Sequence, residues 1–255
     1  MPSDGGNPDA ADAADAAPFD KSNLVLWLDA PNVTTTNNKV TTWTDKSGLG
    51  NDATQTDPAK QPVPATNVQN ALPAVDFPDA TGAILLVSKG AGFDDFTAGI
   101  SVFIAAKPTA PFVQTYNPLV FLGTATATRN DAIELEQAGN ANNDELGFYD
   151  GTGNVVANVF GNVANPNEFA LYEAVLGAGA LTIYKNGVSI NTTATTSLPT
   201  KVQRPASSIG GAVGLDSIGY APFVGLIGEI MVFKIGFDDT GRKAVEGYLK
   251  TKWNL

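Results

Sequence analysis

The last thirty residues combine a strand pattern with a helix pattern, and this pair constrains the fold more than any other segment. The apolar run Gly225–Phe233 is typical of a buried strand. An acidic N-cap at Asp238 or Asp239 then precedes apolar residues that recur at helical spacing. These apolar residues are Val245, Tyr248, Leu249 and Trp253. We therefore predict a helix that begins at Asp238 or Asp239 and packs this face against a sheet.

Most of the remaining chain has the pattern of short strands separated by polar turns. Runs of Val, Ile, Leu and Phe alternate with Gly, Asn and Asp clusters, which is typical of an all-β sandwich. The pair Asn186 and Gly187 accepts positive φ in a tight turn, so residues 181–190 are predicted to form a hairpin. The predicted strands are residues 24–28, 74–77, 83–87, 100–107, 119–123, 132–137, 146–149, 155–160, 168–176, 180–185, 188–192, 207–209 and 225–233.

The first eighteen residues differ in composition from the rest. Residues 1–18 are rich in Asp, Ala, Pro and Gly, so we predict a disordered tether followed by one domain over residues 19–255. Such tethers are similar to those that follow the lipidated cysteine of bacterial surface lipoproteins. This similarity implies an extracellular or cell-surface location, with an export signal removed from this form. It also allows a lipoprotein tether to the surface. A cytoplasmic protein with a floppy N-terminus is the alternative.

Composition excludes several kinds of site. The chain of 255 residues has no Cys and no His, so catalysis would have to use carboxylates, Tyr, Lys or a hydroxyl. The usual ligands of transition metals, Cys and His, are therefore absent. Calcium remains possible, because it prefers oxygen ligands. The 15 Lys and Arg against 26 Asp and Glu give a net charge of −11, which argues against nucleic acid and anionic membranes as partners. No run approaches the roughly 20 apolar residues of a membrane-spanning helix.

Three segments together resemble the LamG-like branch of the concanavalin A-like lectin/glucanase families. They are LVLWLDA at residues 24–30, WTDKSGLGNDA at residues 43–53, and the C-terminal strand and helix ending in YLKTKWNL. The resemblance extends over about residues 22–255 and implies a jelly-roll sandwich of two antiparallel sheets with one C-terminal α-helix. It also implies an accessory or cell-surface module that binds glycans or proteins.

The loop at residues 43–53 allows two interpretations. In the structural one, Gly residues permit tight turns and the side chain of Asp45 accepts hydrogen bonds from loop amides. In the functional one, Asp45, Asn51 and Asp52 help to coordinate calcium, which takes six to eight oxygen ligands. Calcium is the one cofactor that the sequence predicts.

Glu134 and Glu136 lie two residues apart and therefore face the same side of a predicted strand. This pair allows a glycosidase interpretation, but the acid triplet of laminarinase-like hydrolases is broken here, because Ala132 and Ala138 occupy the neighbouring same-face positions. Contact with glycan hydroxyls and an ordinary solvent-facing polar surface are the alternatives.

A polar loop predicted at residues 140–145 has the hydrogen-bonding groups and nearby aromatic side chain of a lectin site. A solvated hairpin loop is the simpler interpretation. If a glycan binds here, the contacting residues are Arg129, Asp131, Asn142, Asp144 and Tyr149, with Glu134 and Glu136 on the adjacent strand.

Three tryptophans could provide stacking surfaces for sugars, but we interpret them as packing residues. Trp27 lies among Leu residues in a predicted strand, and Trp253 closes the predicted helix. Trp43 begins the segment shared with LamG-like proteins.

The leading hypothesis is a non-catalytic extracellular carbohydrate-binding or adhesion module of a bacterial surface or secreted protein. Its partners would be a glycan or polysaccharide, and other surface proteins or copies of itself. A structural subunit of a surface layer or filament is the first alternative. A polysaccharide hydrolase or lyase that uses Glu134 and Glu136, or a Tyr and Lys pair, is the second.

Overall fold

The computed structural model describes residues 17–78, 82–109, 116–138, 143–162, 167–177 and 179–255. In this part of the chain the regular structure consists of β-strands, the 3-10 turn η2 (Asp216–Ile218) and the helix α2 (Asp239–Trp253). The strands are β1 (Leu24–Thr36), β2 (Lys39–Asp45), β3 (Ala53–Thr54), β4 (Val63–Gln69), β5 (Leu72–Phe77), β6 (Leu85–Val87), β7 (Ile100–Pro108), β8 (Asn117–Leu122), β9 (Ile133–Ala138), β10 (Asn143–Tyr149), β11 (Val155–Asn162), β12 (Ala170–Gly177), β13 (Gly179–Lys185), β14 (Val188–Thr195), β15 (Ser207–Ile209) and β16 (Gly225–Phe233).

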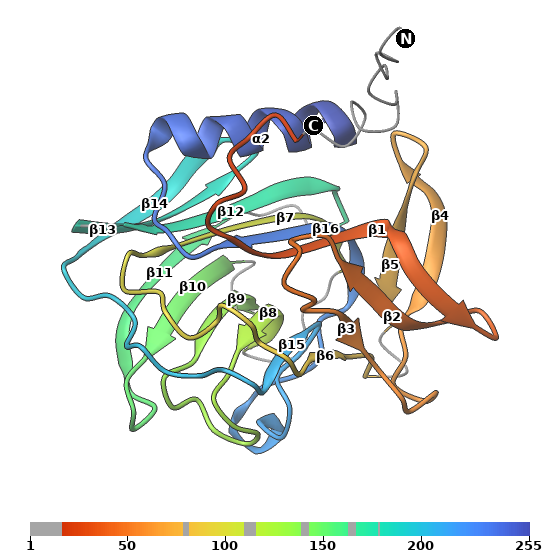
Figure 1. Ribbon diagram of the computed structural model, residues 1–255, viewed down its shortest axis with the longest axis horizontal. Helices are drawn as coiled ribbons and strands as arrows, with labels where there is room; N and C mark the ends of the chain where they lie inside the picture. The colour runs from red at the N-terminus through yellow and green to blue at the C-terminus, as the bar shows by residue number, and fades with distance from the viewer. Residues whose placement is uncertain (1–16, 79–81, 110–115, 139–142, 163–166, 178) are drawn as a thin grey trace, which may run out of the picture.

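The strands form antiparallel layers around one large apolar core. The hydrogen-bonded order runs β11-β10-β9-β8-β15-β6-β3-β2-β1-β16-β7-β12-β13-β14, with β4 and β5 attached beside β16. This path folds back on itself, so that Leu28, Ile104 and Ile230 of one layer share a core with Leu135 and Phe148 of the other. Figure 1 shows the two layers, with α2 lying across the outside of the β7 and β12 layer. The predicted all-β jelly-roll sandwich with a C-terminal helix is confirmed.

Local turn chemistry produces the predicted hairpin. Asn186 and Gly187, with φ of 52° and 81°, connect β13 to β14. Positive φ at both central residues matches the twist of the flanking strands.

Strand β2 is not among the predicted strands. It pairs with the long β1 from Leu28 to Thr36. Its Thr and Lys residues lack a strong apolar pattern, so pairing with β1 supplies what local propensity does not.

The boundaries of the predicted 140–145 loop are wrong at its C-terminal end. Strand β10 begins at Asn143, because residues 143–148 pair with β9 on one side and residues 143–149 pair with β11 on the other. Two neighbouring ladders satisfy the backbone groups here and override the polar composition. Glu145 therefore lies in a strand and not in a loop.

Helix α2 has the predicted cap and the predicted buried face. Asp238 accepts a hydrogen bond from the Gly241 amide at 2.8 Å. Val245, Leu249 and Trp253 are fully buried in a second apolar cluster between α2 and the sheet, whereas Tyr248 is half-buried. All three tryptophans are buried, which confirms that they are packing residues.

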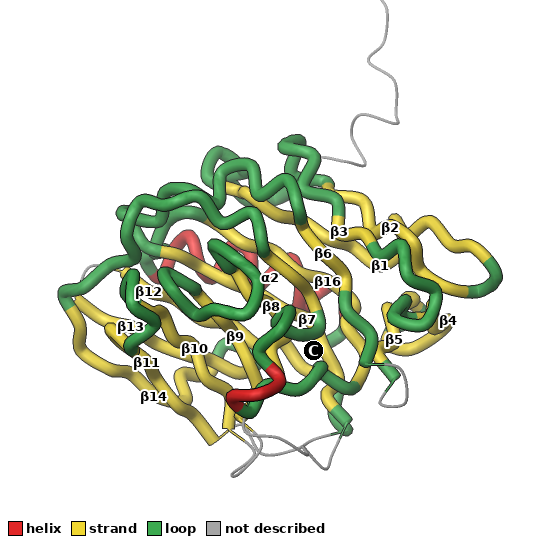
Figure 2. The backbone as a smooth tube through the Cα atoms, turned by 90° about the horizontal axis from the view of Figure 1, so that it is seen from below, coloured by secondary structure: helices red, strands yellow, loops and turns green. Residues whose placement is uncertain are grey.

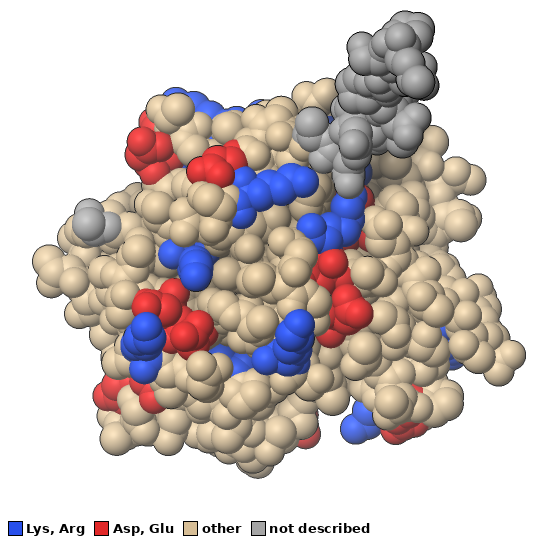
Figure 3. All heavy atoms as spheres, viewed as in Figure 1, with Lys and Arg blue, Asp and Glu red and all other residues tan. Residues whose placement is uncertain are grey.

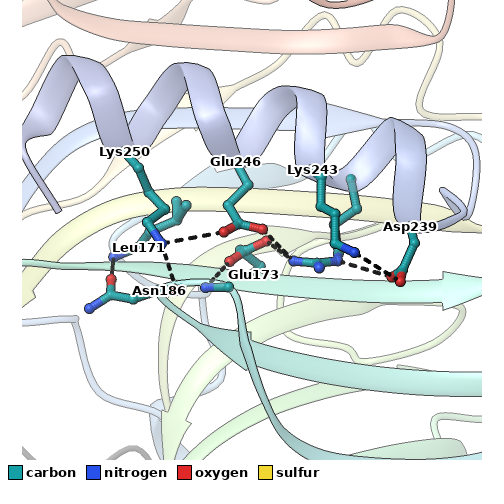
Figure 4. A network of polar contacts seen from close by, with 9 residues as sticks. Leu171, Glu173, Asn186, Asp239, Lys243, Glu246 and Lys250 are labelled. Carbon is teal, nitrogen blue, oxygen red and sulfur yellow. Dashed lines mark hydrogen bonds and ion pairs between the residues drawn. The ribbon is translucent and has the colours of Figure 1, made fainter.

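A network of polar contacts also holds α2 on strand β12 and on the turn between β13 and β14. Arg242 of α2 contacts Glu173 of β12 at 3.1 Å and Glu246 at 2.7 Å. Lys250 donates to the carbonyl oxygen of Asn186, and Glu173 accepts from the Gly187 amide. Figure 4 shows Glu246 and Lys250 pointing from the helix toward Glu173 and Asn186.

The predicted tether at residues 1–18 falls almost wholly outside the described residues. Phe19, the first residue of the predicted domain, packs edge-on against Trp27, Phe233 and Tyr248. No helix in the described part of the chain is long and apolar enough to span a membrane. On the face drawn in Figure 3, acidic and basic side chains lie in small mixed groups and not in one broad patch of either sign.

Candidate functional site: a buried carboxyl and tyrosine cluster

The face of β9 and β10 that points away from the main core contains a cluster of buried polar side chains. Along β9, Ile133 and Leu135 face the core, so Glu134 and Glu136 face the opposite side. On β10, Glu145 lies directly opposite Glu136, and Gly147 lies opposite Glu134. Figure 2 shows β8, β9, β10 and β11 side by side, which places this face on one continuous sheet surface.

Glu134 is held by two tyrosine hydroxyls. Tyr149 of β10 donates to Oε1 of Glu134, and Tyr220, beyond η2, donates to Oε2 at 2.7 Å. The guanidinium of Arg129 lies 4.7 Å from the centre of the Tyr149 ring. Glu134 is fully buried. Burial raises the pKa of Glu134 to about 7, although both tyrosine hydroxyls favour the ionised carboxylate.

Glu136 and Glu145 form a carboxyl pair that lacks enough hydrogen-bond donors. Among the described residues, neither oxygen of Glu136 nor Oε2 of Glu145 has a partner, and Asn158 donates to Oε1 of Glu145 at 3.0 Å. Burial raises the pKa of both carboxyl groups, and the neighbouring acids raise that of Glu136 further. A proton held between the two groups would supply a donor that the described residues do not. Burial therefore disfavours the state in which both carboxyl groups are ionised.

Next to the pair, strand β11 carries a partly exposed row of side chains. Val156, Asn158 and Phe160 alternate with buried residues and share the face of Glu145, because Phe160 lies directly opposite Glu145. Val156 and Phe160 are exposed, and Asn158 is half-buried. The buried acids therefore lie next to side chains of β11 that solvent and ligands can reach.

The structure brings four of the seven predicted glycan-binding residues together. Arg129, Glu134, Glu136 and Tyr149 all belong to the cluster. The interpretation of Glu134 and Glu136 as solvent-facing residues is wrong, because both are fully buried. Tyr220 contacts Glu134 directly.

The other three predicted residues lie outside the cluster or outside the described residues. Asp131 lies in the turn before β9 and accepts a hydrogen bond from the Thr200 hydroxyl. Asn142 is not among the described residues, and of Asp144 only the backbone is described, paired with Gln137 and Gly161. Their role in glycan binding stays a prediction.

Sequence reasoning missed Glu145, Asn158, Phe160 and Tyr220. The predicted loop at residues 140–145 includes Glu145, although its spacing of four residues from Tyr149 puts both on one face of a strand. Tyr220 reaches Glu134 across 86 residues of sequence, and no local pattern indicates such a contact.

The three predicted calcium ligands lie in a separate loop, where hydrogen bonds engage them. Asp45 accepts from the amides of Trp27, Ser47 and Asn51 and from the Ser47 hydroxyl, at 2.6–2.9 Å. Asp52 accepts from the Asp45 amide, and Asn51 is fully buried between the backbones of Val25 and Ala91. Among the described residues, no group of three acidic side chains is arranged to hold a metal ion. These contacts match the structural interpretation, and calcium binding stays a prediction.

Replacement of Asp45 by Ala is expected to destabilise the fold by about 2–4 kcal/mol, because it leaves the amide of Trp27 in β1 and two loop amides without their acceptor. Urea denaturation measures this loss. The exposed Asp57, which accepts one loop amide, provides the control in Asp57→Ala, with a loss below about 1 kcal/mol. If added calcium raises the melting temperature of the unaltered protein but not that of Asp45→Ala, the loop binds the ion. If calcium changes neither, the calcium prediction is wrong.

The comparisons with known proteins identify the fold but no family. No protein-family model matches the chain, and no curated protein matches it either. The LamG-like resemblance therefore stays a prediction from its three segments.

Several solved structures share the architecture. CBM40 of the Ruminococcus gnavus IT-sialidase, bound to α2,3 sialyllactose, is 15% identical with a TM-score of 0.54, over 68% of this chain and 95% of that one. Domain 4 of AbnA, a GH43 extracellular arabinanase from Geobacillus stearothermophilus in complex with arabinotriose, is 16% identical with a TM-score of 0.55, over 86% and 95%. A botulinum neurotoxin type C structure is 11% identical with a TM-score of 0.54, over 90% of this chain and 52% of that one. At these identities the likeness shows that the chain has the β-sandwich fold of these proteins.

Proposed function

We propose that this protein is a non-catalytic extracellular carbohydrate-binding or adhesion module of a bacterial surface or secreted protein. The observation that carries the proposal is the face of β9, β10 and β11, where buried carboxyl groups and a half-buried amide lie beside exposed apolar side chains. Hydrogen-bonding groups next to an apolar surface are what a sugar, with its hydroxyls and C–H faces, requires.

The energetic cost of the cluster supports this proposal. Three buried carboxyl groups with few donors destabilise the sandwich relative to an apolar surface, so their presence indicates a role other than packing. The solved structures with this fold also include complexes with sialyllactose and arabinotriose. A net charge of −11 favours neutral glycans over acidic ones.

The purified protein is expected to bind a subset of neutral glycans in an array and polysaccharide pull-down screen. The screen is run once with calcium and once with chelator. Selective binding supports the module, and its loss on chelation would show that calcium takes part. If no glycan binds under either condition, the proposal is wrong and the structural-subunit alternative becomes the better hypothesis.

A polysaccharide-cleaving enzyme is the second candidate, and one observation favours it. Glu134, with its pKa raised to about 7, accepts a hydrogen bond from Tyr149, so an acid and a hydroxyl adjoin. Depolymerisation by the unaltered protein that is lost in Glu134→Gln would support this candidate. Glycan binding without any depolymerisation would exclude it for the glycans tested.

A further inference from the structure

Phe160 is unusual among the aromatic side chains of the described residues. It is 43% exposed, and every other described Phe, Tyr and Trp is buried or half-buried. An isolated exposed apolar residue is common on proteins, so exposure alone does not indicate a site. The surroundings of Phe160 are what distinguish it.

The backbone around Phe160 is fixed on both sides. Phe160 pairs with Glu145 of β10, and Asn191 of β14 donates to its carbonyl oxygen at 2.7 Å. The adjacent Gly161 lies so close to the β13 and β14 hairpin that a Cβ atom there would come within 2.4 Å of Ile183. Strand β11 therefore cannot shift easily, and the ring is presented from a rigid element.

Asn158 provides an oriented polar group on the same face, two residues away. Its side-chain nitrogen donates to Glu145, which fixes the orientation of the amide. The side-chain oxygen of Asn158 has no partner among the described residues, and the residue is half-buried, so this oxygen can accept from a ligand. Val156 extends the exposed row on the other side of Asn158.

We propose that Phe160 and Asn158 form a saccharide subsite, in which the ring of Phe160 stacks on the C–H face of a neutral pyranose and Asn158 binds its hydroxyls. The inference rests on the proposed function and assigns it a place on the sheet face instead of the loops. Glu145 acts as a positioning residue for the Asn158 amide.

The surroundings also select the class of sugar. A flat aromatic ring is best matched by a pyranose whose hydroxyls are mostly equatorial, because its two faces then expose C–H groups. The chain has a net charge of −11. A uronic acid polymer would be repelled by this net charge, so the subsite favours neutral β-linked glucans over polygalacturonate.

The test compares binding of a soluble β-glucan and of polygalacturonate to the full chain and its variants by isothermal titration calorimetry. Phe160→Ala is expected to weaken β-glucan binding tenfold or more, and Phe160→Trp to retain it. Asn158→Ala is expected to weaken it about fivefold to tenfold, the size expected when a ligand group loses its hydrogen-bond partner. Leu86→Ala is the matched control, because Leu86 is 37% exposed and lies on β6, separated from β11 by β15, β8, β9 and β10.

The outcomes separate the subsite from the function of the whole module. If β-glucan or another neutral glycan binds the unaltered protein and Phe160→Ala binds it equally well, the subsite is wrong while the module function stands. If no glycan binds the unaltered protein, the proposed function fails and the subsite fails with it. If Leu86→Ala weakens binding as much as Phe160→Ala, the effect is not specific to this face and the subsite is wrong. Circular dichroism and melting temperatures confirm that each variant is folded.

Discussion

Replacement of Glu136 by Gln is expected to raise the melting temperature by several °C at pH 8 and to change it little at pH 5. Glu136 is fully buried, and neither of its oxygens has a donor among the described residues. Burial and the adjacent Glu134 and Glu145 raise its pKa well above the usual value. Glutamine has nearly the same shape, is neutral, and its amide can donate a hydrogen bond to Glu145.

The sign of this effect follows from proton linkage. A carboxyl group whose pKa is raised by folding binds more protons in the folded state than in the unfolded one, so stability falls as pH rises between the two pKa values. For Glu134 the window runs from 4.5 to about 7, which corresponds to a loss of about 3 kcal/mol. The pKa of Glu136 is shifted in the same direction. The unaltered protein should therefore be most stable in mild acid.

Calorimetry from pH 5 to pH 8 measures this dependence. A change of 1 kcal/mol corresponds to about 2–4 °C in a domain of this size, so the difference is measurable. Glu168→Gln is the control, because the Glu168 side chain is 53% exposed and pairs with Lys185 at 3.3 Å on the surface. Equal melting curves for Glu136→Gln and the unaltered protein at pH 8 would show that the carboxyl pair is hydrated or already compensated.

Replacement of Glu229 by Ala is expected to destabilise the fold by about 4–5 kcal/mol. Glu229 of β16 is fully buried and accepts from the indole N–H groups of Trp27 at 2.7 Å and Trp253 at 2.8 Å. Lys252 lies 2.8 Å from the same carboxylate. Removing the carboxylate leaves two buried indole donors without an acceptor and takes away one of the two carboxylates that pair with the Lys252 ammonium, the other being Asp29. The contact joins β1, β16 and α2, so the loss should affect global unfolding.

Urea denaturation of Glu229→Ala, Glu229→Gln and Lys243→Ala tests this prediction. Glutamine keeps one acceptor oxygen but directs an amide group at the second indole, so an intermediate loss is expected. Lys243 forms an exposed pair with Asp239, and its removal should cost less than about 1 kcal/mol. A loss of less than 2 kcal/mol in Glu229→Ala would mean that water enters and replaces the carboxylate.

The parts of the fold that depend on local sequence could be predicted. The cap at Asp238, the helical spacing of Val245 and Leu249, and the Asn186–Gly187 turn each act within a few residues, so their patterns are visible in the chain itself. The strongly apolar strands and the sandwich they form follow from the same kind of pattern. Strand β2 and the start of β10 could not be predicted, because their own sequences are polar and pairing with the adjacent strands stabilises them.

The properties of the candidate site also fall into those that depend on local sequence and those that depend on tertiary structure. The sequence by itself determined that Glu134 and Glu136 share one face of a strand, that no His or Cys takes part, and that the net charge favours neutral partners. Only the tertiary structure decided that these acids are buried, that Glu145 lies opposite Glu136, and that Tyr220 covers Glu134. The physical reason is that alternation along a strand is a local property, whereas burial, pKa and donor supply depend on segments that meet only after folding.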